Sequence, residues 1–227
     1  MSVEVPTIYY WPITGLAAAP RLALLATVGP DGYKDVFVES YDDFVKRASC
    51  PECPMLNLPY IEFPGGKAPV AQSNAVLRAI GRRYNLVGQT PEEQDALDEI
   101  LEQMTDFVGE YHKMTYYCAK EEFDSYRKTF ISKSVPYYIG GVEKMMKFRN
   151  GKFVAGGDAP TIADFRVFTL VDAIAKLMEV ERRMVVAEFD HLVPWVQAME
   201  ELPYVKTYLE RYGKLPKNGY LGHWGAE

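Results

Sequence analysis

Two stretches of the chain carry residue types that could bind an extended peptide ending in a carboxylate. In the first, Asn57 to Phe63, a proline follows Leu58 just before a predicted strand. Such a proline can form a cis peptide bond, which turns the backbone groups of the preceding residue outward for a ligand. In the second, Gln72 to Arg78, the pattern predicts a helix capped by Ser73. The unpaired N–H groups and positive dipole end of a helix start suit a carboxylate.

Other reactive side chains give weaker signals. Cys50 and Cys53 have C-x-x-C spacing, but a thioredoxin-type redox pair would follow the first strand, and these cysteines lie just before the proline turn. A structural loop, a regulatory disulfide and a metal site stay open, although no second C-x-x-C is present for zinc. The histidines lie far apart, and no nucleophile elbow, P-loop or dinucleotide glycine pattern occurs. We expect no metal and no cofactor.

The elements that must position these residues change in type along the chain. Residues 7–11, 34–39 and two short runs around Gly65-Gly66 have strand character, and helices are expected at 20–26, 41–48 and 73–84. The first 84 residues therefore predict the order β-α-β-α-β-β-α, with a mixed sheet.

After residue 90 the pattern is helical. Apolar residues recur at helical spacing over 91–118, and a second long helix is expected over 124–148 with a break at Pro136. Thr161 and Asp164 form a variant of the capping box before the apolar run 165–171. Shorter helices are predicted near 192–202 and 204–212. The fold class is thus α/β plus all-α, with domains at 1–85 and 91–227 and a linker at 86–90.

Composition excludes several classes of protein. The 227 residues are 48% hydrophobic and 25% charged, as in an ordinary globular protein. A net charge of −6 argues against nucleic acid as the main partner. No apolar run is long enough for a transmembrane helix and no signal peptide is evident. Three cysteines fit a reducing compartment, so the expected location is cytoplasmic.

Four motifs, in order, resemble the cytosolic glutathione S-transferases over nearly the whole chain. Tyr10-Trp11-Pro12-Ile13-Thr14-Gly15-Leu16-Ala17 resembles the first strand and loop of the tyrosine-type classes and is most similar to mu. The stretch around Leu58-Pro59 resembles the family's cis-proline turn, and the stretch from Gln72 resembles its glutathione-carboxylate segment. Val154 to Asp164 resembles the capped helix of its second domain.

The resemblance implies an N-terminal thioredoxin-like domain followed by an all-helical C-terminal domain, and a homodimer. It implies attack of the glutathione thiolate on a hydrophobic electrophile. A glutathione-dependent isomerase of the prostaglandin type and a non-catalytic ligand-binding protein on the same fold are the alternatives.

Ionising the glutathione thiol is the central chemical task that the resemblance assigns. A thiol of pKa about 8.5 is mostly protonated at pH 7, and lowering the pKa by two units requires roughly 2.7 kcal/mol. A hydrogen bond to a charged acceptor contributes about 1.5–3 kcal/mol. One hydroxyl could therefore supply most of the activation, and the resemblance assigns this role to Tyr10. Tyr9 is the rival, since side chains alternate along a strand and only one can face the site.

The resemblance also assigns the remaining contacts. Leu58 would pair its backbone with the cysteinyl unit, and Gln72 and Ser73 would bind the γ-glutamyl carboxylate. Further glutathione-binding residues are expected to be Trp11, Asn57, Pro59, Lys46 and, across the dimer interface, Asp106. Hydrophobic-substrate residues are expected to be Ile13, Tyr111 and Tyr116.

The glycyl end departs from the mu pattern. Phe44 stands where mu has a tryptophan, and Ala48 stands where it has a lysine. Lys46 and Arg47 precede that position, and the sequence leaves open which of them reaches the glycyl carboxylate.

Overall fold

The computed structural model describes residues 4–49, 51, 53 and 55–218 and divides into two compact units. The first unit comprises the described residues of 1–85 together with 202–217, and the second comprises 86–201 and residue 218. The predicted domain boundaries stay a prediction. The compact units differ from them in two respects: residues 202–217 group with the first unit, and the predicted linker 86–90 belongs to the second.

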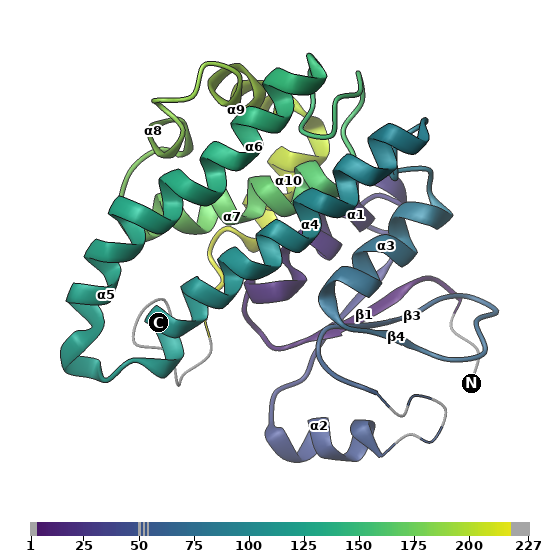
Figure 1. Ribbon diagram of the computed structural model, residues 1–227. Helices are drawn as coiled ribbons and strands as arrows, with labels where there is room; N and C mark the ends of the chain where they lie inside the picture. The colour runs from purple at the N-terminus through teal and green to yellow at the C-terminus, as the bar shows by residue number, and fades with distance from the viewer. Residues whose placement is uncertain (1–3, 50, 52, 54, 219–227) are drawn as a thin grey trace. The chain divides into compact units, whose positions relative to one another are not determined.

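The first unit contains a mixed sheet in the order β2-β1-β3-β4 (Figure 1). Its strands are β1 (Thr7–Tyr10), β2 (Lys34–Phe37), β3 (Tyr60–Glu62) and β4 (Val70–Ala71). β1 pairs in parallel with β2, and the other two pairings are antiparallel. A parallel pair needs a crossover between its strands, and the helix after β1 provides it.

Four helices complete this unit: α1 (Ala18–Thr27), α2 (Tyr41–Ala48), α3 (Ser73–Arg83) and α10 (Pro203–Tyr212). α1 packs against both α3 and α10. In Figure 1, α3 and α2 lie on opposite sides of the strands. The predicted order β-α-β-α-β-β-α is confirmed. α10 joins this unit from the far end of the sequence.

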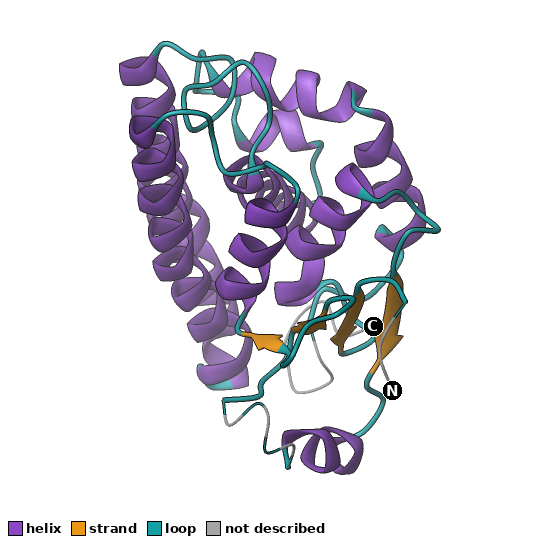
Figure 2. Cartoon of the chain, turned by 90° about the vertical axis from the view of Figure 1, so that its right-hand side faces the viewer, coloured by secondary structure: helices purple, strands orange, loops and turns teal. Residues whose placement is uncertain are grey.

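All regular structure in the described part of the second unit is helical. The strands drawn in Figure 2 all belong to the first unit. Its longer helices are α4 (Pro91–His112), α6 (Val135–Arg149), α7 (Ile162–Met178) and α9 (Leu192–Glu201). Shorter helices are α5 (Phe123–Thr129), α8 (Arg182–Val185) and the single turn η3 (Lys120–Glu122). Among the described residues, no helix is long and apolar enough to cross a membrane.

Both long predicted helices are interrupted by wider turns. α4 continues as a five-residue π-helix, η2 (Lys113–Tyr117), and a second π-helix, η4 (Phe130–Ser134), separates α5 from α6. The predicted break at Pro136 is confirmed, and its cause is the proline's missing N–H and its bulk against the preceding turn. Pro136 accordingly sits in the first turn of α6.

The predicted capping box of α7 is confirmed. The Thr161 N–H donates to Asp164 Oδ2 at 2.7 Å, and the Thr161 side chain accepts from the backbone of the first turn. Asp164 is fully buried and also accepts from the Val154 N–H at 3.0 Å and the Trp195 indole N–H at 2.9 Å. One short carboxylate thus joins the helix start, the preceding loop and α9.

Candidate functional site

Tyr10 lies at the end of β1 with its side chain 5% exposed. Its hydroxyl oxygen accepts a hydrogen bond from the Leu16 N–H at 3.0 Å. Gly15 lies against the same hydroxyl with a φ of +37°, and a Cβ atom there would come within 2.6 Å of the oxygen. The loop after β1 is therefore folded closely around the Tyr10 hydroxyl.

Tyr9 faces the other side of the sheet, as the alternation of strand side chains requires. Its ring stacks on that of Tyr60 with centroids 4.4 Å apart, and its hydroxyl donates to Glu62 Oε2 at 2.9 Å. Burial, and then the hydrogen bond to Glu62, raise the pKa of Tyr9. Tyr9 is thus engaged in contacts with β3.

A buried ion pair supports the loop around Tyr10. The Arg21 side chain is fully buried, and its Nε donates to Asp35 Oδ2 at 2.9 Å. Its Nη1 donates to the carbonyl of Ile13 at 2.6 Å, and its guanidinium lies 5.7 Å from the centroid of the Tyr10 ring. Ile13, a predicted substrate residue, is itself buried in this loop.

The end of α10 closes the same network from the opposite side. The hydroxyls of Tyr212 and Tyr33 lie 2.7 Å apart, and the Arg21 guanidinium carbon lies 5.0 Å from the centroid of the Tyr212 ring. Burial is the largest cause raising the pKa of both tyrosines. Four residues beyond α10, the Pro216 carbonyl accepts from the Thr14 N–H at 2.8 Å. Sequence reasoning missed these contacts, because nothing local in the chain pairs residue 14 with residue 216.

The proline turn has the predicted backbone form, since the Leu58–Pro59 peptide bond is cis. Leu58 and Pro59 are buried, and Asn57 is exposed. The Leu58 N–H, expected to pair with a peptide ligand, donates to Asn57 Oδ1 at 2.8 Å. A ligand that takes this N–H must therefore displace the Asn57 side chain.

The predicted cap of α3 is wrong by one residue. Ser73 is the first helical residue, and the N-cap is Gln72, which makes no side-chain capping bond. Gln72 has a φ of +75°, an uncommon conformation for a residue with a side chain. This backbone turn places Ser73 inside the first turn, at the positive end of the helix dipole. Gln72 is exposed and Ser73 is half-buried.

Lys46 and Arg47 differ clearly in their surroundings on α2. Arg47 Nε donates to Asp43 Oδ1 at 3.1 Å, and its Nη1 donates to the Tyr60 hydroxyl at 3.3 Å. Lys46 is exposed. Trp11 is half-buried, with its ring centroid 5.9 Å from that of Phe44.

The predicted residues of the second unit lie on α4 and the π-helix after it. Asp106 is exposed. Tyr111 is buried, and its hydroxyl oxygen accepts from Asn218 Nδ2 at 3.1 Å. Burial raises the pKa of Tyr111 above its ordinary value. Tyr116 is half-buried, with its ring edge-on to that of His112 at 5.4 Å.

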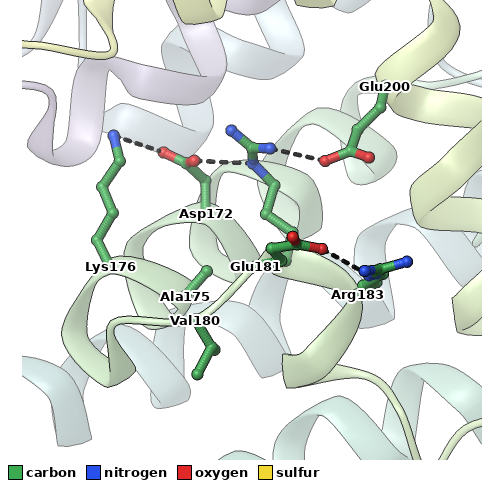
Figure 3. Close-up of a pocket in the computed structure, with 8 residues that line it drawn as sticks. Asp172, Ala175, Lys176, Val180, Glu181, Arg183 and Glu200 are labelled. Atoms are coloured by element: carbon green, nitrogen blue, oxygen red, sulfur yellow. Dashed lines mark hydrogen bonds and ion pairs between the residues drawn. The ribbon is translucent and has the colours of Figure 1, made fainter.

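A depression of about 330 Å³ in the second unit contains none of the predicted site residues. Figure 3 shows its charged side chains paired with one another. Asp172 contacts Lys176 at 3.3 Å and Arg182 at 2.9 Å, and Arg182 also contacts Glu200 at 2.6 Å. Because its acids and bases neutralise each other, this depression presents no net charge to a ligand.

The C-x-x-C is described only in part, because Cys50 lies outside the described residues. Cys53 is a buried free thiol whose sulfur lies 3.8 Å from the Pro69 carbonyl oxygen. The choice between a structural loop and a regulatory disulfide stays a prediction.

Comparisons with known proteins agree with this fold. The family model for the glutathione S-transferase C-terminal domain matches residues 105–212. Human glutathione S-transferase Mu 3 is 28% identical over 95% of this chain and 93% of its own. A glutathione S-transferase of Dirofilaria immitis is 29% identical over 92% of this chain and 95% of its own. A pi-class glutathione S-transferase structure from Onchocerca volvulus has a TM-score of 0.79 at 28% identity, covering 98% of this chain and all of that one.

These similarities, which extend over nearly the whole chain, support a glutathione S-transferase and hence an enzyme. Mu-class enzymes occur among its relatives, which supports the mu-like resemblance of the sequence. The predicted fold class, an N-terminal α/β domain with an all-helical C-terminal domain, is confirmed.

Proposed function

We propose that the protein conjugates glutathione to hydrophobic electrophiles and that the Tyr10 hydroxyl stabilises the glutathione thiolate. The observation that carries this proposal is the contrast between the two tyrosines of β1. The Tyr9 hydroxyl donates a hydrogen bond to Glu62, whereas the Tyr10 oxygen accepts one from the Leu16 N–H. An accepted hydrogen bond polarises the O–H bond and makes the hydroxyl a stronger donor to a thiolate.

The first unit supplies a framework for the tripeptide. The backbone of Leu58 would pair with the cysteinyl unit after the Asn57 side chain releases the Leu58 N–H. Asn57 and Pro59 would then lie beside that unit. Gln72 and Ser73 would bind the γ-glutamyl carboxylate, which the positive start of α3 favours. The positive φ of Gln72 supports this assignment, because unusual backbone conformations are concentrated at ligand sites. Lys46 and Trp11 would bind the glycyl end.

The second unit would supply the electrophile site and a contact between subunits. Tyr111 and Tyr116, together with Ile13, would contact an apolar substrate. Asp106 is exposed on α4, where it would reach the ammonium of glutathione bound to the other subunit of a homodimer. The expected cytoplasmic location is part of the same proposal.

Replacing each tyrosine of β1 by phenylalanine tests the proposal, with Tyr9→Phe as the matched control. Tyr10→Phe should raise the pKa of bound glutathione, read from thiolate absorbance against pH. It should also lower kcat/KM with chlorodinitrobenzene by about 10²-fold, which corresponds to ~2.7 kcal/mol. Tyr9→Phe should leave both within about twofold. Equal, near-background rates in all three proteins would refute the enzymatic reading and favour a binding protein.

The variant Ser73→Ala separates the binding of glutathione from the ionisation of its thiol. It removes a hydroxyl at the start of α3, so it should weaken glutathione binding by about tenfold, equivalent to ~1.4 kcal/mol. The pKa of the bound thiol should not change. Calorimetric titration with glutathione measures the first quantity, and normal affinity would contradict the assignment of Ser73.

A further inference from the structure

Helix α2 packs only weakly against the rest of the first unit. None of its residues, Tyr41 to Ala48, is buried. Its N-terminus is capped by Ser40, whose hydroxyl accepts from the Asp43 N–H at 3.1 Å. A helix of eight residues with no buried side chain needs specific contacts to hold it in place, because short helices are marginal alone.

Arg47 supplies such contacts through two of its guanidinium nitrogens and through the face of the group. Nε donates to Asp43 on the preceding turn, and Nη1 donates to the Tyr60 hydroxyl on β3. The guanidinium carbon lies 5.1 Å from the centroid of the Tyr9 ring on β1. A planar fork can satisfy two edges and one face together, which a lysine ammonium cannot do.

The surface that Arg47 contacts is formed by side chains that also contact one another. The rings of Tyr9 and Tyr60 are stacked within 10° of parallel, and the Tyr9 hydroxyl is held by Glu62. These three residues come from adjacent strands, β1 and β3. Arg47 therefore joins a poorly buried helix to a surface formed by two paired strands.

Lys46, the neighbouring residue, has the opposite character. It is exposed and has no ion pair or hydrogen bond within the described part of the chain. Successive helical residues point about 100° apart, so Lys46 cannot share the Tyr9–Tyr60 surface while Arg47 occupies it. Phe44 contacts Trp11 from the same helix, so the placement of α2 also sets the surroundings of Trp11.

We propose that Arg47 is a positioning residue for the glutathione site: it fastens α2 to the stacked Tyr9–Tyr60 pair and thereby places Lys46 and Trp11 for the glycyl carboxylate. Two of the Arg47 donors already serve Asp43 and Tyr60, so we assign its guanidinium to holding α2 in place and not to binding the tripeptide. This inference rests on the proposed function for its ligand, but the fastening of α2 can be tested without glutathione.

Amide hydrogen exchange of the intact protein tests the fastening. Arg47→Ala should speed exchange across α2 by about threefold to fivefold and leave α3 unchanged, because the free energy of local opening falls. Arg47→Lys should not restore protection, Tyr60→Phe should give a smaller increase, and Lys46→Ala should give none. Unchanged α2 exchange in Arg47→Ala would overturn the proposal.

A double-mutant cycle on glutathione affinity tests the consequence. Lys46→Ala should raise the KM for glutathione about tenfold in the wild-type background but less than twofold in Arg47→Ala, because α2 is then already displaced. Arg47→Ala should leave kcat at saturating glutathione and the bound thiol pKa unchanged.

The two experiments fail in distinguishable ways. Additive effects of Lys46→Ala and Arg47→Ala on KM would show that Arg47 binds the tripeptide directly, and this would overturn the positioning role. Wild-type protein that binds no glutathione would overturn the proposed function and the glycyl-site half of this inference. The exchange result would still decide whether Arg47 fastens α2.

Discussion

The two faces of β1 are stabilised in opposite ways. On the Tyr10 face, the fully buried Arg21 pairs with Asp35 and donates to the Ile13 carbonyl, and its guanidinium lies against the ring of Tyr212 at the end of α10. On the Tyr9 face, Arg47 joins a helix with no buried residue, and the side chains of Arg47 and Asp43 are 31% and 37% exposed. The comparison suggests that the ionising group is held rigidly, whereas the α2 segment that would hold the ligand can adjust.

The largest difference should appear when each arginine is truncated. Arg21→Ala leaves the buried Asp35 without its ion pair, and we expect a loss of about 3–5 kcal/mol in the free energy of unfolding. Arg47→Ala breaks a partly exposed pair and should cost less than ~1 kcal/mol. Urea denaturation of both variants measures the two values. Similar losses of stability in the two variants would contradict the proposed difference between the two faces of β1.

Glycine substitutions sharpen the comparison at the Tyr10 hydroxyl. Gly15 and Gly29 have φ values of +37° and +77°, so alanine should cost either site ~1–3 kcal/mol in stability through backbone strain. Only at Gly15 does the new methyl group meet the Tyr10 hydroxyl, whereas at Gly29 it meets no atom of the described chain within 4 Å. Conjugation rates of the folded proteins should therefore fall at least tenfold, ~1.4 kcal/mol, for Gly15→Ala alone. A rate loss of the same size in Gly29→Ala would point to a general effect of strain.

The smallest expected effect on stability at neutral pH comes from the ionisation of Tyr9 and Tyr212, one on each face of β1. Burial raises the pKa of Tyr9 and of Tyr212 above the ordinary value of 10.0. Folding therefore favours their protonated forms, and this stability is complete below pH 10 and is lost as the pH rises above it. In wild type, the free energy of unfolding should fall by up to about 1.4 kcal/mol per pH unit for each such group. Tyr9→Phe and Tyr212→Phe should each make this fall less steep in denaturation measured from pH 9 to 11. An unchanged slope in both variants would contradict the assignment.

Local patterns in the sequence were sufficient for most elements. Alternating and helical spacing placed the strands and helices, and Thr161 with Asp164 marked a helix start, because these signals depend on residues within one or two turns. The cap of α3 was misplaced because Ser73 resembles a cap in sequence, while the positive φ of Gln72 is a property of the folded turn.

The supporting structure of the site could not be predicted in the same way. Arg21 and Asp35 are only fourteen residues apart, but Tyr33 and Tyr212 are separated by 179. No periodic pattern links such positions, since their pairing depends on how α10 packs against α1. The contact of Arg47 with the Tyr9–Tyr60 pair likewise depends on where that pair lies in the folded sheet, which a run of charged residues does not reveal.

The contact between Thr14 and Pro216 has a consequence for the order in which the protein is made. The two residues are 202 positions apart, and at synthesis rates of about 5–20 residues per second the ribosome needs roughly 10–40 s to add the intervening chain. The loop around Tyr10 is therefore synthesised early. Its hydrogen bond to the Pro216 carbonyl can form only after the helical unit has been translated. The loop that surrounds the Tyr10 hydroxyl can therefore complete its contacts only after most of the chain has been made.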